Sequence, residues 1–505
     1  MKILNVDQIR ALDQSTIEHE PIAPINLMER AALAFVDWFV DHFPNTTPVK
    51  LFCGLGNNGG DGLAIARLLL EREFPIEVYV VRYARRESDD FMHNHRRLKL
   101  LTENIRYVEV AQEIPGLRHN ELIIDAILGS GLSRPTEGIV KNVIDVINRS
   151  PATVVAVDIA SGLYVDKPNA PSDTIVEPDY TITFQLPKLA FMLPKNSRYV
   201  GDWHIVDIQL HKRYIDLAPT PYYYTQSRDA RLLLRKRDKF SNKGSFGHAL
   251  LMVGSYGKMG AAVLATKACL RSGVGLLTVH VPKCGYDILQ IAVPEAMCRP
   301  DGNPNVLTGT PDRGASELGS PTPADYAVVG IGSGIGQAPE TLDMLKGLLK
   351  TLKKPMVIDA DALNLLSENR ELLKQIPPNS ILTPHPKEFE RLTQKWDNDY
   401  QKLDILREFA QKYRVVVVLK GANSAIATPD GDIHFNSTGN PGLSTGGTGD
   451  VLTGVLTALL AQNYDSVEAA VLGVFAHGLA GDRVAAKRGQ IGMVATDIIE
   501  ALRWE

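Results

Sequence analysis

The sequence has few of the features that mark secreted, membrane-spanning or nucleic-acid-binding proteins. Its 505 residues include four cysteines, which show no CxxC spacing and have few histidines near them, so no zinc site is expected. No apolar run approaches the length of a membrane span, and residues 1–10 lack the long apolar core of a signal peptide. A formal net charge of −4 gives no electrostatic reason to expect a nucleic acid or a membrane surface as partner. The expected setting is the reducing cytoplasm.

The composition is that of a globular protein with more than one domain. Apolar residues make up 44% of the chain and charged residues 22%, as in ordinary globular proteins. A chain of 505 residues is too long for one hydrophobic core and predicts two or three domains. The composition is compatible with a monomer and with a homo-oligomer.

The first half of the chain alternates between strand and helix patterns. Residues 1–46 show helical spacing of apolar residues, interrupted at Pro21 and Pro24. A buried-strand pattern at 48–53 then leads into the glycine-rich loop Gly54–Gly62 and a helix at 63–70. Further strands are expected at 76–81, 105–110, 122–128, 153–157, 180–184 and 203–207. This alternation predicts a doubly wound, mostly parallel α/β sheet, in which ligands bind beyond the carboxyl ends of the strands.

Polar residues of the first half gather at those strand ends. Asp125 and Asp158 end two of the predicted strands, and Ser161 follows closely. Gly54, Gly56 and Gly59 match the dinucleotide spacing G-x-G-x-x-G, which is a weak signal by itself. The alternative for either aspartate is a helix cap or a buried turn residue.

The second half begins with a basic segment, which we interpret as the solvated face of a helix over residues 228–237. Residues 211–240 as a whole are expected to be a junction, and residues 299–322 a surface loop rich in Gly and Pro. Several polar motifs then follow predicted strands: Gly332–Gly336, the pair Asp359 and Asp361, Thr383–Pro386, and Lys420–Ser424.

The most informative stretch runs from Asn440 to Leu460. Gly446, Gly447 and Gly449 permit positive φ angles and close approach of the backbone to a ligand. A helix expected to begin near Asp450 would direct free N–H groups and the positive end of its dipole at that loop. Asp450 could take a proton from a substrate hydroxyl, so the stretch has the parts of a phosphoryl-transfer site. The alternative is that Asp450 is only an N-cap.

Residues 1–215, above all Gly54–Arg67 and Val157–Gly162, resemble the epimerase domain of NAD(P)H-hydrate repair enzymes. The resemblance implies a Rossmann-like three-layer sandwich in which Asp158 is the acid/base residue, assisted by Lys188. It also implies a K⁺ ion held by Asn58, Asp125 and Ser161. Ala160 stands where many relatives have proline. The substrate contacts that it implies are Asn57, Asn58, Gly59, Gly60, Asp61, Gly129, Ser130, Gly131, Leu132, Ser133, Arg134, Pro135 and Asp158.

Residues 222–505 resemble the ribokinase-like, ADP-dependent NAD(P)H-hydrate dehydratases. The resemblance implies Mg²⁺ and ADP, with Asp450 as the catalytic residue. His385 taken alone would more often be a structural histidine, and Asn242 stands where many relatives carry histidine, so it receives no role. The hydrate contacts implied are Ala261, Gly334, His385 and Asp450. The nucleotide contacts implied are Lys420, Gly421, Ala422, Asn423, Ser424 and Gly449.

Together the two halves predict a bifunctional enzyme that epimerises NADH hydrate and NADPH hydrate and dehydrates the S form, with ADP converted to AMP and phosphate. The first alternative is a small-molecule kinase of the ribokinase or hydroxyethylthiazole kinase class with a regulatory N-terminal domain. Such a kinase would release a stable phosphorylated alcohol, whereas the dehydratase releases inorganic phosphate. The second alternative is a non-catalytic nucleotide sensor or protein-binding module, which would bind nucleotide without turnover.

Overall fold

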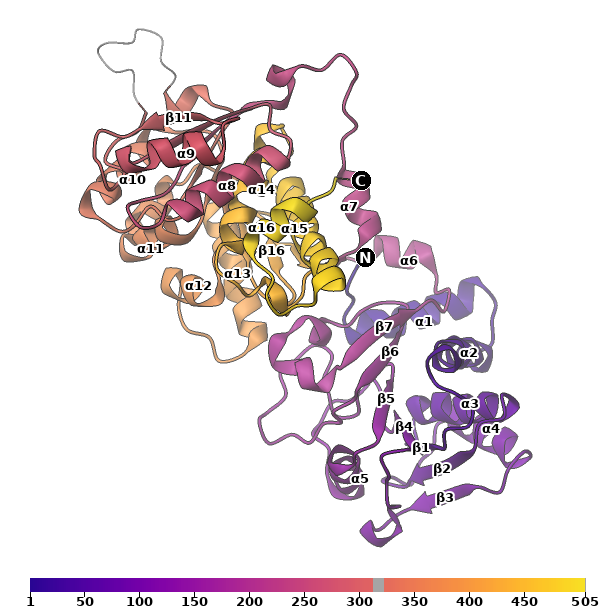
Figure 1. Ribbon diagram of the computed structural model, residues 1–505. Helices are drawn as coiled ribbons and strands as arrows, with labels where there is room; N and C mark the ends of the chain where they lie inside the picture. Colours follow the sequence, from indigo (N-terminus) through magenta and orange to yellow (C-terminus); the bar gives the residue numbers. More distant parts are fainter. Residues whose placement is uncertain (312–321, 505) are drawn as a thin grey trace. The chain divides into compact units, whose positions relative to one another are not determined.

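The computed structural model describes residues 1–311 and 322–504. The chain divides into two compact units (Figure 1). The N-terminal unit is Lys2–Thr220, and the C-terminal unit is Pro221–Glu505 together with Met1. Most of the segment expected to be a surface loop, residues 312–321, lies outside the described residues.

The N-terminal unit is built on a seven-stranded parallel sheet with the strand order β3-β2-β1-β4-β5-β6-β7. All five residues of β1, Val49–Cys53, are buried, because both faces of a parallel sheet are covered. The other strands are β2 (Ile76–Val81), β3 (Ile105–Val108), β4 (Leu122–Ala126), β5 (Thr153–Val157), β6 (Tyr180–Phe184) and β7 (Asp202–Val206).

Helices cover both faces of this sheet (Figure 1). On one face α2 (Pro24–His42), α3 (Asn57–Glu71) and α4 (Asp89–Lys99) pack on one another and on the strands. On the other face α5 (Gly138–Arg149) packs on the second row of strand side chains. A capping box between Asn5 and Gln8 starts α1 (Val6–His19), and Pro24 occupies the first position of α2. The expected pair of helices before the first strand is therefore confirmed. The last helix of the unit is α6 (Lys212–Leu217).

The C-terminal unit contains a ten-stranded sheet with the order β11-β10-β9-β12-β13-β14-β15-β16-β17-β8. The strands from β11 to β15 are parallel, β16 is antiparallel to both of its neighbours, and β17 is parallel to β8. Their bounds are β8 (Tyr222–Thr225), β9 (His248–Met252), β10 (Leu276–Val281), β11 (Met297–Pro300), β12 (Val328–Ile331), β13 (Met356–Ile358), β14 (Ile381–Leu382), β15 (Val416–Leu419), β16 (Ala425–Ala427) and β17 (Ile433–Asn436).

Both faces of the second sheet are also buried, since the successive residues 249–252 of β9 and all four residues of β15 are buried. Four helices form a packed layer on one face: α8 (Met259–Arg271), α14 (Thr448–Ala461), α15 (Ser466–Arg488) and α16 (Ala495–Ala501). The remaining helices are α7 (Ser227–Leu233), α9 (Tyr286–Ala292), α10 (Pro339–Thr351), α11 (Ala360–Glu368), α12 (Pro386–Leu392) and α13 (Asp399–Tyr413). The predicted α/β class with two doubly wound halves is confirmed.

Two strands were not expected from the sequence. β8 comes from the segment interpreted as a junction, and it forms an edge strand only because β17, more than two hundred residues later, pairs with it. Met297–Pro300 forms β11 at the opposite edge, where the predicted loop begins. Short edge strands of this kind depend on a distant partner, so local sequence carries little signal for them. The basic helix is also shorter than expected, because α7 ends at Leu233.

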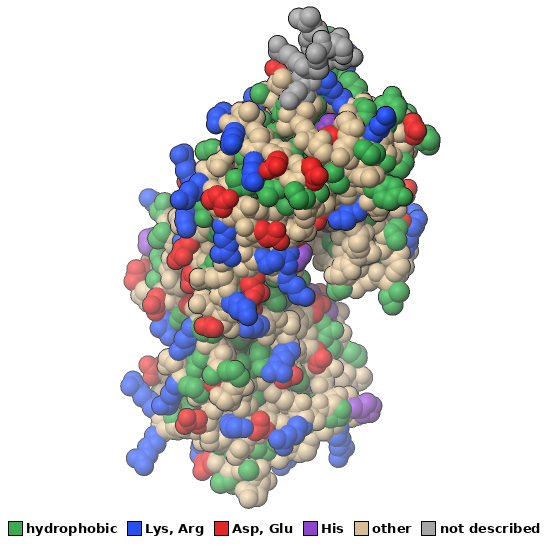
Figure 2. Space-filling model, turned by 90° about the vertical axis from the view of Figure 1, so that its left-hand side faces the viewer, with side chains coloured by type: hydrophobic (Ala, Val, Ile, Leu, Met, Phe, Trp, Pro, Cys, Tyr) green, Lys and Arg blue, Asp and Glu red, His purple; other side chains and the backbone are tan. Residues whose placement is uncertain are grey.

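The surface agrees with a solvated interpretation of the basic residues. On the face drawn in Figure 2, Lys and Arg side chains are interspersed with Asp and Glu instead of forming one patch. Among the described helices, none combines the length and the apolar character that crossing a bilayer requires.

Candidate active sites

A cavity of about 580 Å³ lies at the carboxyl ends of the strands in the N-terminal unit. Its volume is within the range of small-molecule sites. Of the predicted substrate contacts, Gly59, Gly60 and Pro135 lie outside its lining. The predicted residues that do line it are Asn57, Asn58, Asp61, Gly129, Ser130, Gly131, Leu132, Ser133, Arg134, Asp158 and Lys188.

The glycines before α3 are required for close packing. A Cβ on Gly54 would lie 1.9 Å from the carbonyl oxygen of Ile127, and one on Gly59 would lie 1.9 Å from the carbonyl oxygen of Gly54. The first turn of α3 is thereby pressed against the ends of β1 and β4. Its free N–H groups and the polar side chains of Asn57 and Asn58 consequently reach the cavity.

Asp158 and Lys188 form a charged pair at the wall of the cavity. Asp158 follows β5 with φ at +66°, a left-handed conformation that is uncommon for a residue with a side chain. Its Oδ1 accepts hydrogen bonds from Lys188 Nζ, from Thr183 Oγ1 at 3.2 Å and from the Phe184 backbone N–H at 3.0 Å. The Lys188 side chain is 2% exposed and that of Asp158 14% exposed. This set of donors fixes the orientation of the Asp158 carboxyl group at the border of the cavity.

Two of the three predicted potassium ligands, Asp125 and Ser161, are hydrogen-bonded to each other near the ends of β4 and β5, and the third, Asn58, lies in the first turn of α3. The fully buried Asp125 accepts hydrogen bonds from the Ser161 hydroxyl at 2.6 Å and from the Ser161 backbone N–H at 2.8 Å. Burial raises the pKa of Asp125 to about 6, and hydrogen bonds from Ser161 and Ile127 oppose the rise. The buried Asn58 side-chain nitrogen has no hydrogen-bond partner in the described chain. If the amide oxygen and nitrogen of Asn58 are exchanged, a free oxygen takes the position of this unpaired nitrogen.

Two further carboxyls line this cavity. Burial raises the pKa of Asp13 to about 6, and the charge of Asp158 adds to the rise while Lys188 opposes it. Burial, together with the charges of Asp158 and Asp13, raises the pKa of Asp61 well above its usual range. Asp61 was predicted as a contact and Asp13 was not. The available signal was the position of Asp13 on the apolar stripe of α1, four residues from both Ile9 and Ile17, which also line the cavity.

The glycine-rich stretch of the C-terminal unit starts α14 at Thr448, with Gly447 as the N-cap at φ +94°. The interpretation of Asp450 as only an N-cap is therefore wrong, because Asp450 lies inside the first turn. The expectation of positive φ holds for Gly447 alone among the three glycines. A Cβ on Gly449 would lie 3.6 Å from Lys420 Nζ and 3.7 Å from Asp359 Oδ2, so glycine leaves room at this point.

Asp450 lies beside an ion pair in which it is not a direct partner. Lys420 Nζ donates to Asp359 Oδ1 at 2.9 Å, and Thr453 Oγ1 donates to Asp359 Oδ2 at 2.8 Å. Burial raises the pKa of Asp450 to about 6; the nearby Ser333 hydroxyl lowers it, the charge of Asp359 raises it, and that of Lys420 lowers it. Asp359 follows a predicted strand, but its contact with Lys420 depends on residues 61 positions apart.

Two of the four predicted hydrate contacts, Ala261 and Gly334, meet at the start of α8. A Cβ on Gly334 would lie 3.1 Å from the Cβ of Ala261 and 3.0 Å from the carbonyl oxygen of Lys258. His385 caps α12, with Nδ1 accepting from the backbone N–H of Lys387 at 3.1 Å and of Glu388 at 3.3 Å. Burial lowers the pKa of His385 although the charge of Glu388 opposes the change. Its side chain is 45% exposed, so it combines a capping role with a free ring face.

The two loops predicted to hold the nucleotide are braced from within the unit. Lys420–Ser424 forms the turn between β15 and β16, closed by the Ser424 hydroxyl donating to the Gly421 carbonyl at 3.0 Å. Asp482 of α15 accepts from the Gly439 backbone N–H and from the Asn440 amide, both at 2.9 Å. The buried His477 bonds to the Thr448 carbonyl at 3.0 Å, and burial lowers its pKa to about 4.

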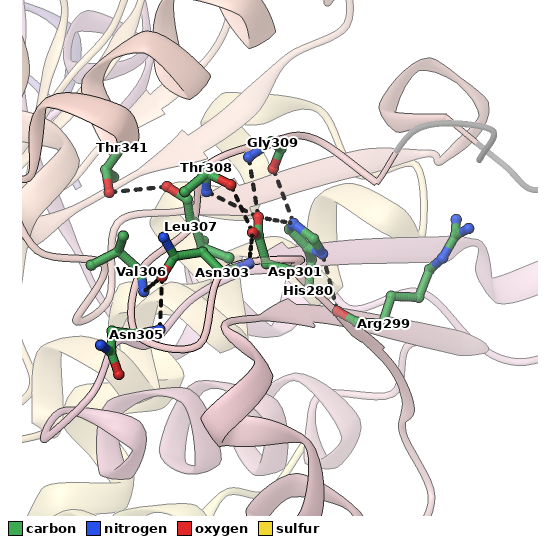
Figure 3. A network of polar contacts seen from close by, with 10 residues as sticks. All are labelled: His280, Arg299, Asp301, Asn303, Asn305, Val306, Leu307, Thr308, Gly309 and Thr341. Carbon is green, nitrogen blue, oxygen red and sulfur yellow. Dashed lines mark hydrogen bonds and ion pairs between the residues drawn. The ribbon is translucent and has the colours of Figure 1, made fainter. Parts of the chain in front are cut away.

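Asp301 and His280 lie at the centre of a polar network (Figure 3). Asp301 accepts from the backbone N–H groups of Thr308 at 2.9 Å and Gly309 at 3.1 Å, and His280 Nε2 lies 3.4 Å from Asp301 Oδ2. This network fixes the loop 301–309, whose Asn305 carbonyl accepts from the Tyr256 backbone N–H at 2.8 Å. Tyr256 lies close in sequence to Lys258 and Ala261, so the network supports the wall of the second site.

The fold and the two sites together define an α/β enzyme with one nucleotide-type site in each unit. Each has an aspartate and a lysine near the start of a helix whose N–H groups are free, at the carboxyl ends of parallel strands. Proton transfer at a hydroxyl and binding of phosphate are the chemistries that these features serve.

Family comparisons agree with this architecture. Residues 249–503 match the family model described as NAD(P)H-hydrate dehydratase, and residues 24–190 match the model described as YjeF-related protein N-terminus. The bifunctional NAD(P)H-hydrate repair enzyme of Moorella thermoacetica is 34% identical over 99% of this chain and 96% of its own length. The Escherichia coli enzyme of the same name is 32% identical, over 98% of this chain and 92% of its own. The chain belongs to the family of bifunctional NAD(P)H-hydrate repair enzymes.

The predicted family and function in nicotinamide nucleotide repair are thus confirmed, in preference to the small-molecule kinase. Among solved structures, the ADP/ATP-dependent NAD(P)H-hydrate dehydratase of Bacillus subtilis, co-crystallised with ATP and Mg²⁺, is 31% identical. It covers 56% of this chain and 99% of its own, with a TM-score of 0.48.

Proposed function

We propose that the N-terminal unit interconverts the R and S forms of NADH and NADPH hydrate and that the C-terminal unit dehydrates the S form at the expense of ADP. The observation that carries this proposal is the presence of two separate aspartate sites, Asp158 with Lys188 and Asp450 near Lys420. Two sites are needed because only one epimer is the substrate of the second reaction.

In the first reaction, the configuration of the carbon that carries the added hydroxyl is inverted. Asp158 is the acid/base residue, and Lys188 orients it through a direct hydrogen bond. Asn57 and Asn58 at the start of α3 and the loop 129–134 surround the nucleotide. K⁺ takes oxygen ligands, and the Asp125 carboxylate, the Ser161 hydroxyl and the Asn58 amide are a suitable donor set. Bound there, the ion would neutralise the buried charge of Asp125.

In the second reaction, Asp450 takes the proton of the substrate hydroxyl as its oxygen attacks the terminal phosphorus of ADP, and AMP leaves. The phosphate ester is a better leaving group than hydroxide. The C–O bond then breaks, a proton leaves the adjacent carbon, and the double bond returns with release of phosphate. The backbone N–H groups of residues 446–449 stabilise charge on the transferring group, and Lys420 supplies a cation beside it.

The nucleotide sits against Lys420–Ser424 and Gly449 in this proposal. Mg²⁺ bound to its phosphates would neutralise their charge. Such an ion is commonly held by one or two carboxylates, substrate phosphates and water rather than by a full protein cage. Consistent with this, the described residues contain no group of three or more His, Cys, Asp or Glu side chains arranged to hold a metal.

The test uses the purified chain with a mixture of R and S NADH hydrate, ADP, Mg²⁺ and K⁺, followed by the absorbance of reduced nicotinamide. Full recovery is expected, with one inorganic phosphate and one AMP released per NADH formed. An Asp158→Ala variant should show a fast phase for the S form and then only spontaneous epimerisation. A stable phosphorylated product, or no recovery with either ADP or ATP, would contradict the proposal.

A further inference from the structure

The first helix of the chain contributes a carboxyl to the epimerase cavity. Ile9, Asp13 and Ile17 recur every fourth residue of α1 and line the cavity together, as residues on one face of a helix do. Among the described residues Asp13 makes no hydrogen bond or ion pair, and the same is true of Asp61. These two carboxyls therefore differ from Asp158, which is engaged by Lys188, Thr183 and the Phe184 backbone.

The charges around Asp13 and Asp61 favour the protonated form of both carboxyls. Asp61 from α3 and Asp158 after β5 face it within the cavity, and Lys188 is already committed to Asp158. The remaining charged side chains in the lining are Arg10, Asp90 and Arg134, and Tyr83 is the other titratable group. Three neighbouring carboxyls with one buried lysine among them do not all ionise together, because like charges disfavour the ionised form.

Epimerisation, as proposed above, needs an acid as well as a base. Water added across the C5–C6 bond places the hydroxyl on C6, next to the ring nitrogen N1. Inversion by ring opening removes the hydroxyl proton, forms a C6=O bond and breaks the C6–N1 bond, with the electron pair left on N1. N1 must then gain a proton. Closure on the opposite face of C6 reverses each step, so one group cycles as base and a second as acid.

We propose that Asp13 is this second catalytic residue, the proton donor that complements Asp158 in the epimerase site. Asp158 takes the hydroxyl proton, and Asp13 delivers a proton to N1 and recovers it when the ring closes. Asp61 instead keeps its proton and donates a hydrogen bond to the substrate. A pKa near the working pH suits a group that must both give and regain a proton, and the pKa of Asp13, raised by burial to about 6, meets that condition.

The experiment uses the full chain and R NADH hydrate without ADP, with the R and S forms separated by chromatography over time. Asp13→Asn should lower kcat by about a hundredfold, the scale of general acid catalysis, with KM within about threefold of the parent. The parent kcat should fall as pH rises above 6, because Asp13 then loses its proton, and this alkaline limb should vanish in the variant. Asp13→Glu should restore part of the rate and the alkaline limb.

Two controls separate a catalytic role from a structural one. Glu18→Gln removes an exposed carboxyl from the same helix, where Glu18 only accepts from Gln14, and should leave kcat and its pH profile unchanged. Dehydration of pure S hydrate with ADP reports the C-terminal unit and should be the same in every variant. If Asp13→Asn fails to fold, the pH profile of Asp13→Glu decides the question.

The outcomes are distinct. An Asp13→Asn variant with parental kcat and pH profile, or one changed only in KM, would overturn the role of Asp13. A parent chain that does not interconvert the two forms would overturn the proposed epimerase function itself.

Discussion

The two sites use similar parts in different electrostatic settings. In the N-terminal unit, Lys188 donates directly to Asp158, the proposed acid/base residue, which also accepts two further hydrogen bonds. In the C-terminal unit, Lys420 donates to Asp359, and Asp450 is buried beside that pair without accepting from the lysine. The lysine of the first site orients its aspartate directly, whereas burial raises the pKa of Asp450 to about 6 and the charge of Lys420 only opposes that rise.

The two glycine-rich loops need glycine for different reasons. Gly54 and Gly59 have no room for a Cβ because backbone atoms lie less than 2 Å from its position. Gly447 instead has φ at +94° and caps α14. One loop needs glycine for close packing and the other for backbone conformation, although both bring free N–H groups to a ligand.

The largest effects are expected from removing each catalytic carboxylate. Asp450→Asn should lower the rate of dehydration of S hydrate by about 10²- to 10⁴-fold, the range of general base catalysis, and leave epimerisation unchanged. Asp158→Asn should lower the rate of epimerisation over the same range and leave dehydration unchanged. Separate assays on pure S hydrate with ADP and on R hydrate without ADP measure the two rates. Loss of both activities in either variant would mean that the two sites do not work independently.

Lys188→Met should affect both catalysis and stability of the N-terminal unit. The variant leaves the Asp158 carboxylate without its cation, so we expect about 2 kcal/mol of lost stability, less than for a fully enclosed pair because Asp158 borders the cavity. The matched control is Lys141→Met, which removes a surface pair with Asp145 and should change stability by less than about 0.5 kcal/mol. Urea unfolding measures the stability of each variant, and the epimerisation assay measures its activity. Equal stability of the two variants would argue against a buried pair.

The pH dependence should distinguish the two reactions. Asp450 acts as a base when ionised, and its pKa is raised to about 6, so dehydration should be fast above pH 6 and slow below it. Between pH 7 and pH 5 the ionised fraction falls about tenfold, and the rate should follow it. Epimerisation should instead decline above pH 6 if Asp13 is its acid. Initial rates in buffers of constant ionic strength measure both, and a flat dehydration profile would exclude Asp450 as the titrating base.

The smallest effect is expected from the support of the second site. Burial raises the pKa of Asp301, but hydrogen bonds from His280, Asn303 and Thr308 lower it well below its usual range. A depressed pKa adds stability that is present above the unfolded pKa and is lost as pH falls through the folded value. Asp301→Asn should therefore destabilise the C-terminal unit by about 1–2 kcal/mol at pH 7, with little change in epimerisation. Denaturant unfolding at pH 7 and pH 3 should show a smaller difference at pH 3, which lies below the unfolded pKa.

Much of the fold follows from local pattern. The alternating elements were predicted from the helical and strand periods and from the breaks at Pro21 and Pro24. These signals are local, because the buried positions of a helix or a strand recur every few residues. Parallel strands also direct their carboxyl ends to one edge. For that reason Asp158, Asp359 and the loop before α14 could be placed near ligand sites before any contact was known.

The tertiary structure alone decided which distant residues meet. The sequence placed Lys420 and Asp450 in one site, but only folding shows that the lysine contacts Asp359. Likewise Asp13, on a helix with an ordinary apolar stripe, enters the epimerase cavity because α1 packs over it, and β8 becomes a strand because β17 reaches it. Sequence patterns repeat over a few residues and so determine elements and their faces. Proton affinities and edge pairings depend on contacts between segments tens to hundreds of residues apart, and only the folded chain supplies them.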